Sequence, residues 1–196
     1  MKTLWSVFRP ALVSLLVFSA VCGLLYPLVV GLVAAGVFPH QATGSLIVDH
    51  GKVVGSELVG QPFDEAGYFW SRPTAIANYQ AMNSSGTNLG PLSGDLHQAV
   101  ADRVAALRAA DPGNTAPVPV DLVTASGSGL DPDISPAAAY YQVPRVARAR
   151  GVAEAEVRAL VASHIEERTL GILGERRVNV LLLNRALDAR LGALGH

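Results

Sequence analysis

The feature that most constrains this chain is a run of apolar residues near its N-terminus without a single charged side chain. The run extends from Ala11 to Phe38. A bilayer core about 30 Å thick needs about 20 helical residues to cross it. We therefore expect one transmembrane helix over residues 10–33, which begins at Pro10 because the first helical turn tolerates proline. Pro27 is expected to kink this helix, as neighbouring helices in a membrane allow.

A cleaved signal peptide is the main alternative to this anchor. The apolar part of a signal peptide runs about 7–15 residues before small residues at the cleavage site. This run is about twice as long, and the sequence at Val33, Ala34 and Ala35 makes a poor cleavage site. A lipid-modified Cys22 is disfavoured because Val21 before it is bulky and the apolar run continues past it. The length favours an uncleaved anchor.

The positive residues near the apolar run predict its orientation. Lys2 and Arg9 precede the run, and Lys52 is the first lysine or arginine after it. Cytoplasmic flanks of membrane helices carry an excess of lysine and arginine. We therefore expect residues 1–9 to be a short cytoplasmic N-terminus and residues 34–196 to form an extracytoplasmic domain, in a single-pass protein of the cell (inner) membrane.

The composition after the apolar run limits the classes of partner. About 158 residues remain, which is enough for one domain with a single core. All 16 acidic residues and 13 of the 15 lysines and arginines lie after Phe38. A slightly acidic domain lacks the positive surface that phosphate backbones require, so nucleic acid is excluded as a partner. Cys22 is the only cysteine, so no disulfide can form within the chain.

The hydrophobic pattern predicts strands first and helices later, which is typical of an α+β domain. Short strands are expected at residues 46–48, 52–55 and 68–70, and a buried strand is expected at residues 120–124. A long polar loop is expected over residues 76–94.

Four helices are expected in the rest of the domain. The first begins near Ser93 or Asp95 and stops at Asp111, the second begins after Ser135 and ends at Gly151, and the others cover residues 153–168 and 179–191. Pro144 is expected to break or kink the second. His164 is expected on the buried side of the third, with a hydrogen-bond partner.

The sequence motifs of known catalytic sites are absent from this chain or have the wrong spacing. The phosphate-binding pattern G-x-x-x-x-G-K-[ST] is absent, as is the Asp-Lys-Thr-Gly run of an aspartyl-phosphate pump, so the chain is not expected to hydrolyse ATP alone. Ser128 lies between two glycines, but the spacing is not that of a nucleophile elbow. The alternative is a loop in which Ser126 and Ser128 cap turns. We expect no catalytic residue.

Metal sites and a basic patch are weakly indicated. The five histidines are far apart and do not form the H-E-x-x-H pair of a zinc site. Asp131 and Asp133 lack the other ligands of a calcium loop, so no metal site is expected. Arg145, Arg148 and Arg150 lie near two tyrosines and could form a docking face. Their composition alone favours a solvated helix flank.

Several segments together resemble one family, the C subunit of the Kdp-type potassium-transporting ATPase. These segments are GQPF at 60–63, YFWSRP at 68–73, SGTNLGP at 85–91, PVDLVTASGSGLDP at 119–132, ISP at 134–136, YQV at 141–143, RVA at 145–147, LGE at 173–175, RVNV at 177–180, LN at 183–184 and LD at 187–188. With the N-terminal span, the resemblance covers nearly the whole chain. Thr87, Asp133 and Arg176 depart from the family pattern, where serine, histidine and proline are usual.

The resemblance implies a non-catalytic accessory subunit of a complex that takes up potassium at the expense of ATP. Its partners would be a potassium-translocating channel-like subunit, a P-type ATPase subunit, a small single-span subunit and membrane lipid. The chain would need no cofactor of its own, since ATP and potassium are handled by the complex. The family is described as an assembly factor and as a chaperone that raises the ATP affinity of the ATPase subunit.

The resemblance also implies one candidate contact. Gln142, with Arg145 beside it, is the candidate contact for nucleotide or for a partner. An extracytoplasmic Gln142 could not reach cytoplasmic ATP, so an effect on ATP affinity would have to pass through the transmembrane helices. Two other interpretations stay open at this point: an anchored exported hydrolase that uses Ser126 or Ser128, and an anchored ligand-binding domain.

Overall fold

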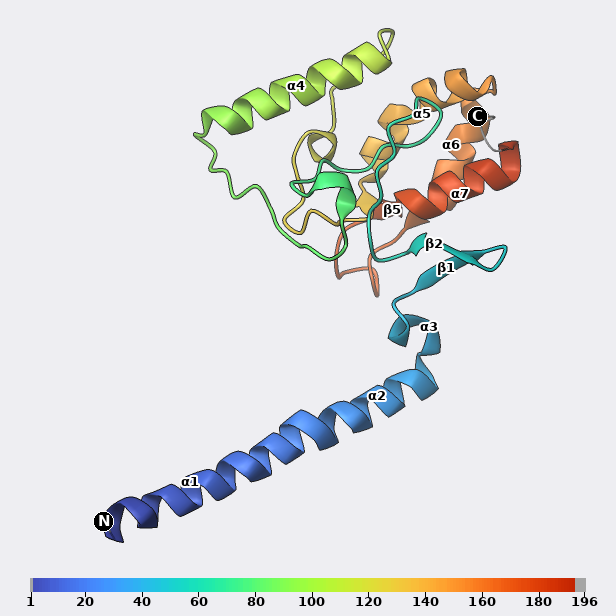
Figure 1. Ribbon diagram of the computed structural model, residues 1–196. Coiled ribbons are helices and arrows are strands. Elements are labelled where there is room, and N and C mark those ends of the chain that lie inside the picture. Colours follow the sequence, from blue (N-terminus) through green and yellow to red (C-terminus); the bar gives the residue numbers. More distant parts are fainter. Residues whose placement is uncertain (1, 193–196) are drawn as a thin grey trace. The chain divides into compact units, whose positions relative to one another are not determined.

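The computed structural model describes residues 2–192, and the chain in it divides into two compact units (Figure 1). The first unit comprises residues 1–46 and the second comprises residues 47–196.

The first unit is a long apolar helix followed by one short turn of helix. It consists of α1 (Lys2–Ala20), a π-helical segment (Val21–Leu25), α2 (Tyr26–Val37) and α3 (Pro39–Ala42). Residues Trp5–Val37 are long and apolar enough to cross a membrane. The helix begins earlier than expected, since α1 begins at Lys2 and contains Pro10, while the membrane span over residues 10–33 stays a prediction. Membrane helices accommodate such a proline because nearby groups can satisfy the freed carbonyl.

The backbone around Pro27 changes its hydrogen bonding. The Tyr26 N–H bonds to the Val21 carbonyl, five residues back, instead of four. A single π-helical turn of this kind absorbs the disturbance that a proline causes in an α-helix. The π-helical segment ends two residues before Pro27, and the kink expected at Pro27 stays a prediction.

The second unit has two small sheets. Strands β1 (Leu46–Asp49) and β2 (Lys52–Ser56) form a hairpin. Strands β3 (Asp133–Ile134), β4 (Ile165–Glu166) and β5 (Arg177–Asn179) form an antiparallel sheet in the order β3-β5-β4. Ile134 and Ile165 both lie opposite Val178, which is fully buried. The mixture of helices and a small sheet confirms the predicted α+β fold.

Helices supply most of the core of the second unit. They are α4 (Gly94–Ala110), α5 (Pro136–Arg150), α6 (Glu154–Ser163) and α7 (Val180–Leu191). The completely buried side chains at their centre are Val143, Val146, Val157, Val161, Leu183 and Leu187. The expected caps are present, because the Ser93 and Ser135 hydroxyls accept the Leu96 and Ala138 N–H groups. Helix α5 is capped at its C-terminus by Gly151, whose φ of 66° suits a glycine.

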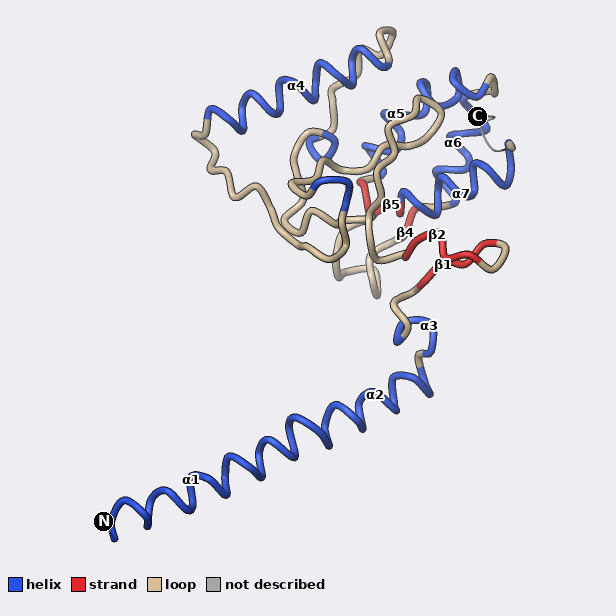
Figure 2. Tube along the Cα trace, in the orientation of Figure 1, coloured by secondary structure: helices blue, strands red, loops and turns tan. Residues whose placement is uncertain are grey.

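Two predicted strands are absent. Residues 120–124 contain a 3₁₀ turn (Val120–Leu122). The Thr124 N–H and hydroxyl both donate to the Val120 carbonyl and close this turn. Residues 68–70 form no strand, and Figure 2 shows most of the chain between β2 and α4 as loop. Side chains take the place of a neighbouring strand there, as shown below.

Two predicted helices also differ from the structure. Helix α6 ends at Ser163 instead of 168, because His164 and Ser163 side chains bond to the Leu160 carbonyl and the chain then pairs as β4. The expected hydrogen bond of His164 is thereby found. Pro144 does not break α5, which continues to Arg150 although proline has no N–H to donate at that position.

Candidate functional site

The candidate contact residues lie under residues 65–72, a segment without regular secondary structure that begins with a turn at residues 65–68 and that we call the strap. The strap is held by side chains of α5 and α7 and not by a strand. The hydrogen bonds to its residues 65–70 are made by Gln142, Arg145, Arg150, Asn184 and Asp188. Helix spacing explains this set, because residues three or four apart share one helix face.

Gln142 is fully engaged within the domain. It is 1% exposed, and its Oε1 accepts the Trp70 N–H at 2.7 Å and an Arg145 N–H at 2.6 Å. Its Nε2 donates to the Trp70 carbonyl at 3.2 Å and to the Ala138 carbonyl at 3.3 Å. A glutamine amide offers two acceptor lone pairs and two donors. All four are used by this chain itself.

Arg145 is a buried cation without a carboxylate in contact. It is 3% exposed, donates to the Ala66 carbonyl at 2.6 Å, and lies 4.2 Å from the centre of the Trp70 ring. Burial lowers its pKa from 12.5 to about 10, which leaves it charged at neutral pH. The carbonyls, the Gln142 amide and the ring face stabilise its charge.

Asn184 and Asp188 hold the other half of the strap from α7. The Asn184 amide accepts the Phe69 N–H at 2.8 Å and donates to the Phe69 carbonyl at 2.9 Å. Asp188 accepts the Tyr68 hydroxyl at 3.0 Å and pairs with Arg150 at 2.8 Å. Both residues were quoted above within family motifs, but no role was predicted for either. Their spacing of four, on an otherwise apolar helix face, is the signal that could have found them.

The predicted basic patch is a solvated flank at only one of its three arginines. The side chains of Arg145 and Arg150 are buried under the strap, whereas the Arg148 side chain is 58% exposed and pairs with the buried Asp111. The arginines therefore fasten loops to α5, because each guanidinium can donate several hydrogen bonds in a fixed geometry.

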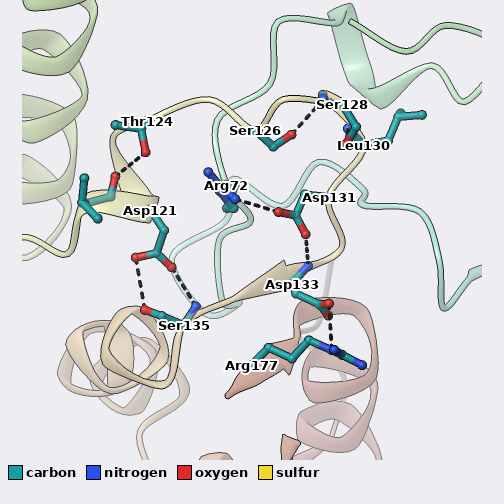
Figure 3. Close-up of polar contacts among 12 residues, drawn as sticks. Arg72, Asp121, Thr124, Ser126, Ser128, Leu130, Asp131, Asp133, Ser135 and Arg177 are labelled. Atoms are coloured by element: carbon teal, nitrogen blue, oxygen red, sulfur yellow. Dashed lines mark hydrogen bonds and ion pairs between the residues drawn. The ribbon is translucent and has the colours of Figure 1, made fainter. Parts of the chain in front are cut away.

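The long motif 119–132 forms an ordered loop beside the strap (Figure 3). Arg72, at the end of the strap, pairs with Asp131 at 2.7 Å. Asp121 accepts the Ser135 N–H at 2.7 Å, which ties the 3₁₀ turn to the start of α5. Asp133 pairs with Arg177 at 3.1 Å. These contacts fix the loop against both the strap and the sheet.

Asp133 has an unusual protonation equilibrium. Burial raises its pKa from 3.8 to about 6, and Asp131 and Glu166 add to the rise, while Arg177 opposes it. The loss of hydration therefore outweighs the ion pair with Arg177. Asp131 and Asp133 do not converge on a cation site, and the described residues contain no group of three or more His, Cys, Asp or Glu that could hold a metal.

The serines of the loop act as turn caps. The Ser126 hydroxyl accepts the Gly129 N–H at 2.8 Å, and the Ser128 hydroxyl accepts the Leu130 N–H at 3.1 Å. Hydrolysis by a serine needs a base within hydrogen-bond reach of the hydroxyl. No histidine bonds to either serine in the part of the chain that the structure describes, so the geometry gives no support to the hydrolase interpretation.

Comparison with known proteins decides the family. The family model described as "K+-transporting ATPase, c chain" matches residues 8–189. The chain belongs to the KdpC family. A Potassium-transporting ATPase KdpC subunit of Sorangium cellulosum (strain So ce56) is 62% identical over 182 residues, which cover 92% of this chain and 96% of the relative. Another, of Variovorax paradoxus (strain S110), is 59% identical over 190 residues and covers 96% and 98%.

Membership in the KdpC family makes this chain an accessory subunit and not the catalytic one. The prediction that Gln142 and Arg145 contact nucleotide or a partner is not tested by these comparisons. The geometry shows what they do within this KdpC domain, which is to fix the backbone and ring of Trp70.

Proposed function

We propose that this chain is the single-pass accessory subunit of an ATP-driven, high-affinity potassium uptake complex in the cell membrane. Its partners are a potassium-translocating channel-like subunit, a P-type ATPase subunit and a small single-span subunit. The names of its relatives and the apolar helix Trp5–Val37 support this assignment. The chain has no cofactor of its own in this proposal.

The proposed topology places residues 1–9 in the cytoplasm, residues 10–33 in the membrane and residues 34–196 outside. The positive residues Lys2 and Arg9 before the span support it. A cysteine at the 97% exposed Met82, in a Cys22→Ser background, should react in intact cells with a maleimide that cannot cross the membrane. Labelling only after the cells are broken open would reverse the orientation.

The domain would act in assembly and as a chaperone that raises the ATP affinity of the ATPase subunit without touching ATP. The observation that carries this proposal is that Gln142 has no donor or acceptor left for a nucleotide. Any effect on ATP affinity is then a coupling between sites, in which the domain favours one conformation of the complex. We place the domain on the outer face of the channel-like subunit.

Truncation tests the proposal directly. A chain that keeps the span but lacks residues 40–196 should leave little assembled complex in the membrane and little potassium uptake. The matched control is the full chain carrying Gln98→Ala, a change at an exposed side chain of α4 that should assemble normally. Normal assembly and uptake from the truncated chain would contradict the proposed function.

A further inference from the structure

A preformed cavity lies between the strap and the C-terminal half of α4. Its volume is about 320 Å³, at the lower end of the range for ligand-binding pockets. Its walls are mainly apolar and aromatic, with Phe63, Trp70, Tyr79, Leu107 and Leu122 among the lining residues. Neither Gln142 nor Arg145 lines the cavity, so it is a different place from the candidate contact described above.

The walls of this cavity are held in place by the contacts of the strap. Trp70 is fixed by the Gln142 amide, by Arg145 against its ring, and by its own indole N–H, which donates to the Glu65 carbonyl at 2.9 Å. The Tyr79 hydroxyl bonds to the Arg72 carbonyl. A cavity whose wall residues are already ordered loses little entropy when it is filled.

Arg103 carries the unpaired charge at the cavity. It lies on α4, lines the cavity and donates one hydrogen bond, to the Val123 carbonyl at 2.8 Å. A guanidinium has five N–H donors, and Arg103 forms no ion pair with the described residues. The charge of Arg72, the other arginine in the lining, is already paired with Asp131, although its buried Nε has no hydrogen-bond partner among the described residues. Asp64, the only carboxylate among the lining residues, is exposed and its charge is screened by water.

We propose that this cavity receives a large apolar or aromatic side chain of a partner membrane subunit, with a neighbouring carboxylate on Arg103. The occupant is a loop of that subunit on the same side of the membrane as this domain. Arginine and aromatic residues around a small, desolvated pocket are typical of the anchor points of protein interfaces. This inference rests on the proposed function, because it names a contact through which the domain joins the complex.

Charge and exposure favour a protein partner over a free metabolite. The unpaired charge of Arg103 is complementary to a carboxylate. Beside the cavity, Val120 begins the 3₁₀ turn that contains the lining residue Leu122, and Val120 is 70% exposed. A small molecule in the cavity would leave this apolar side chain in water, whereas a protein loop can cover it.

Filling the cavity tests the proposal without disturbing the core. Ala106 lines the cavity but is exposed, so Ala106→Trp should occupy the cavity while the domain stays folded. The matched control is Ala105→Trp, at the neighbouring exposed position of α4 that does not line the cavity. In tagged complex purified in mild detergent, Ala106→Trp should reduce the recovered partner subunits at least tenfold, and Ala105→Trp should not.

A second pair of variants tests the charge. Arg103→Met keeps an apolar stem but removes the guanidinium, and Arg108→Met does the same at an exposed position of the same helix. Arg103→Met should weaken association of the chain with its complex about 10- to 100-fold and reduce the dependence of association on salt. Arg108→Met should change both by less than threefold. Thermal unfolding of each purified chain confirms that the domain is folded.

The outcomes separate this inference from the function it rests on. If Ala106→Trp and Arg103→Met assemble as the natural chain does, while the truncated chain does not assemble, the cavity is not the contact and the proposed function stands. If the truncated chain assembles, the proposed function itself fails. A third outcome would assign the cavity to a small molecule and overturn the proposal. In that case indole-3-acetate stabilises the isolated chain saturably, Arg103→Met removes this stabilisation, and both variants assemble normally.

Discussion

Gln142 and Asn184 do for the strap what a neighbouring strand does for a β-strand. Each amide accepts a backbone N–H and donates to the carbonyl of the same residue, Trp70 in one case and Phe69 in the other. The aromatic run at residues 68–70 predicted a strand, but no strand forms there and side chains bind its backbone instead. Its partners could not be predicted, because they are 72 and 115 residues away in the chain.

Replacement of Gln142 measures how much the strap depends on this amide. Gln142→Ala leaves the Trp70 N–H and carbonyl and one Arg145 N–H without their partner in a buried place. The free energy of unfolding should fall by about 2–4 kcal/mol, the usual result when a buried polar network is broken. Thermal unfolding of the full chain in detergent, followed by circular dichroism, measures it. Gln98→Ala is the control, since the exposed Gln98 bonds only to Asp102 on its own helix; equal losses would mean that the strap does not need the buried amide.

Asp133 makes the stability of the domain depend on pH in an unusual direction. Its pKa is raised from 3.8 to about 6 in the folded chain, so the folded state binds a proton more tightly than the unfolded state. Between these values the stability contributed by this group is present at low pH and is lost as the pH rises. The melting temperature of Asp133→Asn, relative to the natural chain, should therefore increase from pH 4 to pH 7.

Removal of Arg177 provides the matched test of that assignment. Arg177 lowers the pKa of Asp133 against the larger effect of burial. In Arg177→Ala the loss of stability with rising pH should therefore extend to higher pH than in the natural chain. A difference between Asp133→Asn and the natural chain that is constant from pH 4 to pH 7 would contradict the raised pKa.

At the scale of elements, the sequence predicted what depends on periodicity and missed what depends on contacts between distant residues. The four helices of the domain were placed because apolar residues recur at helical spacing and serines or glycine mark their ends. Residues 120–124 look like a strand, but the Thr124 hydroxyl closes a turn there and the Asp121 carboxylate ties that turn to the start of α5. The end of α6 was missed because Ile165 pairs with β5, a partner that no local pattern reveals.

The same distinction applies to the candidate site. Gln142 and Arg145 were selected because they lie in motifs that resemble a family, whereas their burial and contacts could not be predicted. The cavity beside Trp70 is formed by residues from four separate segments of the chain, so sequence spacing carries no sign of it.

The glycine-rich loop contains two glycines, Gly127 and Gly129, that differ in the space available for a side chain. Gly129 has a φ of +70°, and a Cβ there would lie 2.7 Å from the Ser85 carbonyl oxygen and 2.8 Å from the Ile76 side chain. A Cβ at Gly127 would meet nothing within 4 Å. Gly129→Ala should cost about 2–4 kcal/mol of stability from backbone strain and steric overlap, and Gly127→Ala about 0.5 kcal/mol or less. Chemical unfolding of both full-length variants measures the difference; equal costs would show that the loop does not need its close approach to Ser85.

At the scale of the whole molecule, the candidate contact Gln142 has no donor or acceptor left for a nucleotide, so we expect the domain to act through its partners. The two units share one chain, and the proposed topology puts the domain and cytoplasmic ATP on opposite sides of the membrane. A domain that binds one conformation of the complex more tightly shifts the population toward that conformation. ATP affinity then rises only as far as the domain discriminates between the conformations.

Reciprocity makes this coupling measurable. If the chain raises the ATP affinity of the complex by some factor, bound nucleotide must raise the affinity of the chain for the complex by the same factor, because binding free energies are linked. Couplings of this kind amount to roughly 5- to 150-fold. The dissociation constant of the full chain from the remaining subunits, measured with and without a non-hydrolysable ATP analogue, should change by the factor found for the nucleotide.

The isolated chain, titrated with the same analogue, should not bind it, because the Gln142 amide is already saturated within the domain. An unchanged dissociation constant would remove the effect on ATP affinity from the proposed function and leave assembly as the role of the domain. Binding of the analogue by the isolated chain would instead restore direct contact, and would require the orientation of the domain to be reversed.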